Sequence, residues 1–275
     1  MTGSTGTIAE DAYQLFRNRP AFDDLIASHA PPGEVARAVR EYRLSVDEHF
    51  LAADAAMSEM KRLEEELVRF AFAPQRSEGP LFAIHWRDKE AAEAISVLYQ
   101  RSFRYALNEV RATLDSATYE VVTSIVGPVE GVVEVGFSDG YINRVMKKYP
   151  DARSKLMPIL NLIHNVRQRS EFKRFDGLRQ ISTHRRIPYT FMQGVAYYVD
   201  EEPLDPPYVT HWLPNDDTSR RPQAPAWSAL ELVKTATRSA AQTIDDLYGV
   251  VVSAYGADES IRYRLCDATS VANGK

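Results

Sequence analysis

An arginine and a histidine in the second half of the chain have the spacing of a pair that could cleave RNA. Arg179 and His184 are separated by four residues and come near the end of an expected helix, shortly before Pro188. A histidine can accept and return a proton near neutral pH. An arginine stays protonated and can stabilise the negative charge of a phosphorane. These two residues are therefore the predicted catalytic pair.

A basic segment surrounds this pair in an otherwise acidic chain. The 275 residues carry a net charge of −5, whereas residues 164–186 hold seven arginines and lysines against two acidic residues. A local excess of positive charge attracts phosphate. The alternative is a solvated helix face that pairs with acidic neighbours. The predicted substrate-binding residues of the segment are Arg174, Ser182, Thr183, Arg185 and Arg186.

Helical geometry assigns the arginine to an apolar face. At about 100° per residue, Arg179 falls between Phe172 and Phe175. Asp176, three residues earlier, is an available partner for its guanidinium. His184 points in a different direction on a regular helix. The pair can share one site only if the last helical turn unwinds or if a second chain contributes one of the residues.

The segment Arg179-Gln180-Ile181-Ser182-Thr183-His184 reads R-x4-H at a helix end. It resembles the motif of the HEPN superfamily, the nucleotide-binding domain shared by higher eukaryotes and prokaryotes, in which four to six residues separate Arg and His. The resemblance covers roughly residues 88–257. It implies a helical bundle that forms homodimers and cuts RNA without a metal, or a relative that has kept only a binding role. Family members often have Asn or another small polar residue after the arginine, where this chain has Gln180.

Other motifs in the chain favour structural roles. Gly136 to Gly140 matches G-x-S-x-G, but long helices surround it instead of alternating strands and helices, so Ser138 or Asp139 is predicted to cap a helix. Arg43 and His49 form an R-x5-H that we interpret as accidental, because it lies in mid-helix without basic neighbours. His164 is a second candidate imidazole, for which a satisfied core position is favoured. The chain contains no GxxxxGK[ST], GxGxxG, HExxH or Glu-x-x-His.

Composition places the chain among ordinary globular proteins. It is 44% hydrophobic and 26% charged, which fits one large domain or two small ones. The single cysteine, Cys266, excludes an internal disulfide framework and a multi-cysteine zinc site. We expect a cytoplasmic protein without a membrane span, because no apolar run approaches about 20 residues and Met1 to Thr7 lack the features of a secretory signal.

Hydrophobic periodicity predicts a mainly α up-and-down bundle with long helices. Helices are expected near 35–72, from 88 onward, at 151–169 and 171–185 with Asp151 and Ser170 as candidate caps, and near 228–255 with Ser228 as the cap. Residues 119–135 allow either a small hairpin or a helix broken at Gly127-Pro128. The expected proline-rich insertion, 188–226, contains a strand candidate at 191–199. The predicted domain covers 8–257, between polar tails at 1–7 and 258–275.

These observations predict a HEPN-like, metal-independent endoribonuclease, in the role of a toxin or defence effector. It is expected to act as a homodimer on RNA or a nucleotide, without a cofactor or metal, and with a cognate regulatory protein as a further partner. The alternative is a non-catalytic HEPN-like protein for interaction or for nucleotide or RNA binding. A third hypothesis, a serine hydrolase with Ser138 as nucleophile, is disfavoured by the missing sheet.

Overall fold

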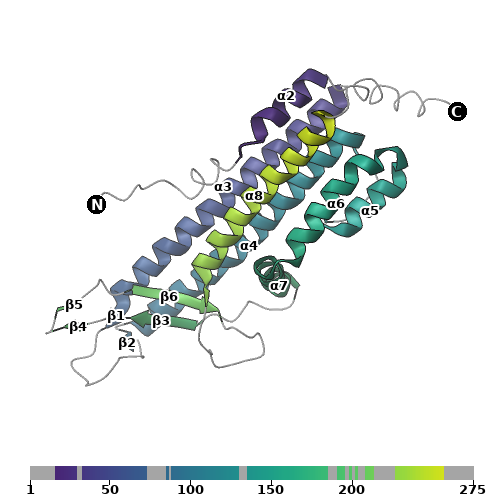
Figure 1. The fold of residues 1–275 in the computed structure, drawn as a ribbon. Coiled ribbons are helices and arrows are strands. Elements are labelled where there is room, and N and C mark those ends of the chain that lie inside the picture. The colour runs from purple at the N-terminus through teal and green to yellow at the C-terminus, as the bar shows by residue number, and fades with distance from the viewer. Residues whose placement is uncertain are drawn as a thin grey trace. The chain divides into compact units, whose positions relative to one another are not determined.

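The computed structural model of the chain is mainly helical, which confirms the predicted mainly α character (Figure 1). It describes residues 16–29, 33–72, 85–86, 88–129, 135–184, 191–195, 198–199, 202–203, 208–213 and 227–256. The helices are α2 (Arg19–His29), α3 (Gly33–Phe70), α4 (Lys89–Val126), α5 (Asp139–Lys148), the 3₁₀ helix η1 (Pro150–Ala152), α6 (Arg153–Gln168), α7 (Ser170–His184) and α8 (Ala229–Gly256). Within the described parts, no helix combines the length and apolar character that crossing a bilayer requires.

The two longest helices follow the apolar stripes of the sequence. In α3 the stripe residues Val46, Met60 and Leu67 are fully buried or nearly so. Helix α4 begins after Asp88, whose Oδ1 accepts a hydrogen bond from the amide of Ala91 at 3.0 Å. It ends at Val126, because the next residue, Gly127, has a φ of +77°, a left-handed conformation that favours glycine, and Pro128 follows. Residues 119–126 are therefore helical, as in the second of the two alternatives expected for that segment.

The expected helix caps are correct at two positions and wrong at two others. Ser138 caps α5 and Ser228 caps α8, each by accepting a hydrogen bond from a backbone amide of the first turn. Asp151 caps nothing, because it lies inside η1 and Ala152 is the residue before α6. Ser170 is already inside α7, since the amide of Lys173 donates to the carbonyl of Arg169 at 3.0 Å.

The expected β-element of the proline-rich insertion is present. Strands β3 (Phe191–Val195), β6 (Tyr208–Leu213) and β7 (Trp227–Ser228) form an antiparallel sheet in that order, with Phe191 opposite Trp212. Two pairs of short strands accompany it, β1 (Ala71–Phe72) with β2 (His85–Trp86), and β4 (Tyr198–Val199) with β5 (Glu202–Pro203). The rest of 188–226 lies outside the described residues, as do the expected tails at 1–7 and 258–275.

The chain forms two compact units. Unit 1 comprises Met1–Leu51, Glu109–Lys173 and Thr237–Lys275, and unit 2 comprises Ala52–Asn108 and Arg174–Ala236. Unit 1 packs the N-terminal half of α3 and the C-terminal halves of α4 and α8 through Arg43, Glu120 and Tyr248. In unit 2 the buried Tyr99 of α4 donates a hydrogen bond to Glu64 of α3 at 3.0 Å. The predicted division into one domain with two tails stays a prediction.

Two glycines should respond oppositely to replacement by alanine. A Cβ atom at Gly136 would lie 2.7 Å from the carbonyl oxygen of Asp115 and 3.0 Å from the ring of Tyr119. A Cβ atom at Gly177, inside α7, would meet nothing within 4 Å. We expect Gly136→Ala to lower the free energy of unfolding by about 1–3 kcal/mol. Gly177→Ala should raise the stability of its part of the chain by up to about 1 kcal/mol.

Urea unfolding followed by circular dichroism measures both effects. A Gly136→Ala variant with the midpoint of the parent would contradict the described contact with α4, and a destabilised Gly177→Ala variant would contradict the open surroundings of that position.

Candidate functional site

The candidate site lies on α7, whose apolar face is buried. Phe175 is 3% exposed and Leu178 is 6% exposed. Arg179 follows directly, and its side chain is only 18% exposed. The predicted position of this arginine on the apolar side of the helix is therefore confirmed. A cation placed there needs a charged or polar partner, because burial of an isolated charge is costly.

Asp176 supplies that partner from the preceding turn of the helix. Its Oδ1 lies 3.4 Å from Nε of Arg179, and its Oδ2 accepts a hydrogen bond from Nε2 of Gln180 at 2.9 Å. The carboxylate itself is only 13% exposed. Asp176 was the partner expected from the sequence. Gln180 was not, although its i, i+4 spacing from Asp176 was an available signal.

This geometry places the guanidinium of Arg179 beside the carboxylate of Asp176. The contact to Asp176 is an ion pair at Nε, and this buried Nε makes no hydrogen bond. Held in this way, Arg179 has a defined direction, which a group that stabilises a transition state requires. At the same time the carboxylate offsets part of its charge.

His184 is the last residue of α7. Five residues of α-helix separate it from Arg179 by about 7.5 Å along the axis and about 140° around it. The side chains of Ser182, Thr183 and His184 lie outside the described residues, and so do Arg185 and Arg186 altogether. Arg174 is half-buried on the same helix. The predicted site residues that lie on α7 are thus positioned by one helix. Among the described side chains, Asp176 contacts both Arg179 and Gln180.

Ser138 has the geometry of a helix cap. Its hydroxyl oxygen accepts a hydrogen bond from the amide of Tyr141 at 3.1 Å, and the hydroxyl donates to the carbonyl of Val135 at 2.7 Å. Both functions of the hydroxyl are therefore used in stabilising the start of α5. The capping interpretation of this G-x-S-x-G segment is confirmed.

The interpretation of His164 as a core residue is wrong. Its side chain is 54% exposed, because it lies on the face of α6 away from the buried Ile159 and Ile163. Nδ1 of the ring lies 3.0 Å from Oδ2 of Asp139, and the other oxygen of that carboxylate lies 3.5 Å from Nη1 of Arg167. Helical periodicity could not reveal this pairing, because His164 and Asp139 belong to different helices.

Arg43 and His49, the second R-x-H pair of the sequence, serve the core of unit 1. Nε of Arg43 donates to the buried Glu120 at 2.7 Å, and its guanidinium lies over the ring of Tyr248, 5.2 Å from the centroid. The ring of His49 lies 2.7 Å from Glu109 instead of near Arg43. The sequence did contain a signal for the buried carboxylate, since Glu120 continues the apolar stripe of α4.

The Glu120 carboxyl is the most perturbed acidic group of this cluster. Burial raises its pKa to about 7, and the attraction of Arg43 and the hydrogen bond from Tyr248 only partly offset that rise. Burial and the neighbouring Glu120 likewise raise the pKa of the Tyr248 hydroxyl well above its ordinary value. Within this cluster the Glu120 carboxyl therefore titrates near neutral pH, although it is not part of the candidate site.

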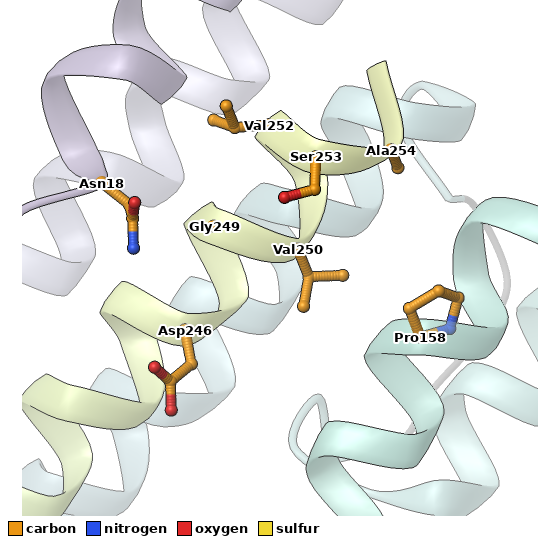
Figure 2. Close-up of a pocket in the computed structure, with 8 residues that line it drawn as sticks. All are labelled: Asn18, Pro158, Asp246, Gly249, Val250, Val252, Ser253 and Ala254. Atoms are coloured by element: carbon orange, nitrogen blue, oxygen red, sulfur yellow. The ribbon is translucent and has the colours of Figure 1, made fainter. Parts of the chain in front are cut away.

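A cavity of about 720 Å³ lies elsewhere in unit 1 (Figure 2). Its walls come from the residue before α2, from α6 and from one face of α8, and they include Asn18, Pro158, Asp246 and Ser253. Asn18 is fixed there by hydrogen bonds from its side-chain amide to Asp245 at 3.0 and 3.2 Å. Of the predicted site residues with described side chains, Arg174 and Arg179, neither lines this cavity.

Comparison with known proteins assigns no family or function to the chain. No protein-family model, curated protein or solved structure matches the chain. Among the described residues, no three His, Cys, Asp or Glu side chains gather in a way that could hold a metal ion.

The titration of Glu120 should make the stability of the protein depend on pH. Its pKa is higher in the folded state, about 7, than the ordinary value of 4.5, so between these values the folded protein holds the proton more tightly. The free energy of unfolding should therefore fall as pH rises from 5 to 8, by about 2–3 kcal/mol from this group. Glu120→Gln, which cannot ionise, should remove that contribution.

Urea unfolding at several pH values tests this expectation. The exposed Glu93 of α4, with 64% of its side chain accessible, provides the matched control Glu93→Gln, which should keep the pH dependence of the parent. Equal pH dependence in the parent and in Glu120→Gln would show that the buried carboxyl does not titrate in this range.

Proposed function

We propose that the chain is a HEPN-like, metal-independent endoribonuclease whose catalytic residues are Arg179 and His184. The observation that carries the proposal is the position of Arg179. It is a largely buried arginine, held by Asp176, five residues before the histidine at the end of the same helix. The motif accounts for this spacing, and the basic segment accounts for the attraction of a phosphate backbone.

In the proposed reaction the 2′-oxygen of RNA attacks the adjacent phosphorus while the bond from phosphorus to the 5′-oxygen breaks. An imidazole of His184 accepts the proton of the 2′-OH, and an imidazolium returns a proton to the leaving 5′-oxygen. The guanidinium of Arg179 stabilises the charge of the phosphorane. Asp176 acts as a positioning residue for Arg179. The products are a 2′,3′-cyclic phosphate and a 5′-hydroxyl.

The remaining predicted residues bind the substrate. Ser182 and Thr183 donate hydrogen bonds to phosphate or the 2′-OH, and Arg174, Arg185 and Arg186 supply positive charge. A homodimer would bring two helix ends together and so provide two histidines for the two proton transfers. The exposed apolar side chains of α4 in the same unit support an interface with a second copy, since Val97 is 56% and Tyr105 is 51% exposed.

A second candidate function is binding of RNA or of a partner without catalysis. The ion pair between Arg179 and Asp176 favours it, because a carboxylate that offsets the charge of the arginine also suits a purely structural role. Either candidate function is compatible with a cognate regulatory protein as partner and with a role in toxicity or defence.

Substitution of the pair should abolish RNA cleavage. We expect His184→Ala and Arg179→Ala each to reduce the rate by about 100-fold or more, the scale of losing a proton-transfer group or a charge-stabilising donor. Arg179→Lys should fail as well, because an ammonium cannot reproduce the planar guanidinium. The assay incubates purified protein with mixed RNA in EDTA and identifies 2′,3′-cyclic phosphate ends.

Two controls accompany these variants. Lys89→Ala removes an exposed charge from α4, outside the basic segment, and should cut at nearly the parental rate. Ser138→Ala tests the serine-hydrolase hypothesis and should also leave cleavage intact below its unfolding temperature. All variants are checked for folding by circular dichroism. A well-folded His184→Ala variant that cuts RNA as fast as the parent would refute the proposal, and a parent that binds but never cuts RNA would favour the non-catalytic candidate.

The protein should sediment as a homodimer. At micromolar concentration, analytical ultracentrifugation should give twice the 31.0 kDa of one chain. Val97→Asp should shift the equilibrium to the monomer, because it places a charge in the proposed apolar interface. Leu44→Asp alters a side chain of similar exposure in unit 1, 55%, and should leave the dimer intact. A parent that sediments as a single chain would contradict this expectation.

A further inference from the structure

The helical pair α5–α6 carries a concentrated positive charge of its own. Residues 139–169 contain seven arginines and lysines and only two acidic residues, a net charge of +5 in a chain whose total is −5. The segment overlaps the basic stretch around the candidate site only at its end. Most of its cations therefore have no role in the proposed reaction.

Five of these seven cations are exposed, whereas Lys155 and Arg167 are half-buried. Helices α5 and α6 lie side by side, and each buries an apolar face that includes Val145 in α5 and Ile163 in α6 (Figure 1). The residues of the opposite side form what we call the α5–α6 basic face. Its exposed members are Asn143, Arg144, Lys147, Lys148, Arg153, Asn161, His164, Asn165, Gln168 and Arg169.

The segment contains two acidic residues, Asp139 and Asp151. Asp139 already contacts His164 at 3.0 Å and Arg167 at 3.5 Å. Asp151, the other acidic residue, lies in the short η1 turn between the helices. Tyr149 adds a half-buried aromatic ring at the same junction, 5.6 Å from Nζ of Lys148.

We infer that the α5–α6 basic face binds single-stranded RNA through its phosphate backbone. The choice of RNA among polyanions rests on the proposed function. The composition of the face fits it, since closely spaced cations match a strand with one charge per nucleotide. Exposed amides can donate to phosphate and sugar oxygens, and an aromatic ring beside a lysine offers a surface for stacking.

The same composition argues against a lipid surface as the partner. A helix that lies on a membrane inserts large apolar residues between the lipid headgroups. None of the exposed large hydrophobic side chains among the described residues falls within 139–169. The face therefore has the charge for an anionic membrane but lacks the apolar side chains that would anchor it.

Neutralising two cations of the face tests the inference. In a His184→Ala background, which should not cut, the binding of a fluorescein-labelled single-stranded 20-nucleotide RNA is followed by anisotropy from 50 to 200 mM KCl. Arg144→Gln/Lys147→Gln should weaken binding about tenfold or more at 100 mM. It should also reduce the slope of log K against log salt by about 1.4, which is 0.7 for each lost phosphate contact.

The matched control removes the same charge elsewhere. Lys61→Gln/Lys89→Gln neutralises two exposed lysines, 70% and 78% accessible, each on a helix and each beside a glutamate. It should bind RNA with nearly the affinity and salt dependence of the background protein. Urea unfolding confirms that both double variants are folded.

The outcomes separate this inference from the proposed nuclease. If the parent does not cut RNA but its binding depends on Arg144 and Lys147, the nuclease fails and the inference stands. If the parent cuts RNA but the double variant binds it as well as the control does, the inference fails and the nuclease stands. Absence of RNA binding, or binding of phosphatidylserine vesicles in its place, would overturn the inference.

Discussion

The buried carboxylate of Glu120 is the constraint around which unit 1 is organised. It is fully buried, and it accepts hydrogen bonds from Arg43 of α3 at 2.7 Å and from Tyr248 of α8 at 2.8 Å. A carboxyl group without these donors would be costly in such a place. The three helices must therefore keep one mutual register, in which both donors reach the same side chain.

Apolar periodicity over many turns made the long helices predictable. Local turn conformations, which periodicity does not reveal, limited how well the helix ends could be predicted. The stripes of α3 and α8 persist over many turns, so their existence and approximate ends could be inferred. Residues 119–126 are rich in β-branched side chains, yet they are helical because Val121, Val122 and Ile125 pack in the core. The caps at Asp151 and Ser170 were missed by about one residue, because a 3₁₀ turn and an extended Arg169 shift the start of each helix.

The candidate site was predictable where its contacts stay within one helix. The burial of Arg179 and its pairing with Asp176 follow from spacings of three and four residues. Contacts between helices have no such signature in a single sequence. Asp139 meets His164 across 25 positions, and Arg43 meets Glu120 across 77. The sequence therefore identified the R-x4-H helix but not the cluster of Arg43, Glu120 and Tyr248. That cluster shows that Arg43, of the second R-x-H pair, has a structural role.

The hydrogen bonds between Asn18 and Asp245 span 227 positions of the chain, and Tyr248 reaches Glu120 across 128. Unit 1 consequently cannot close during synthesis until α8 has left the ribosome. At about 5–20 residues per second, Glu120 waits on the order of ten seconds for its second donor. During that interval the apolar faces of α3 and α4 lack the helix that completes their core. Completion of the unit 1 core therefore depends on α8, the last helix among the described residues.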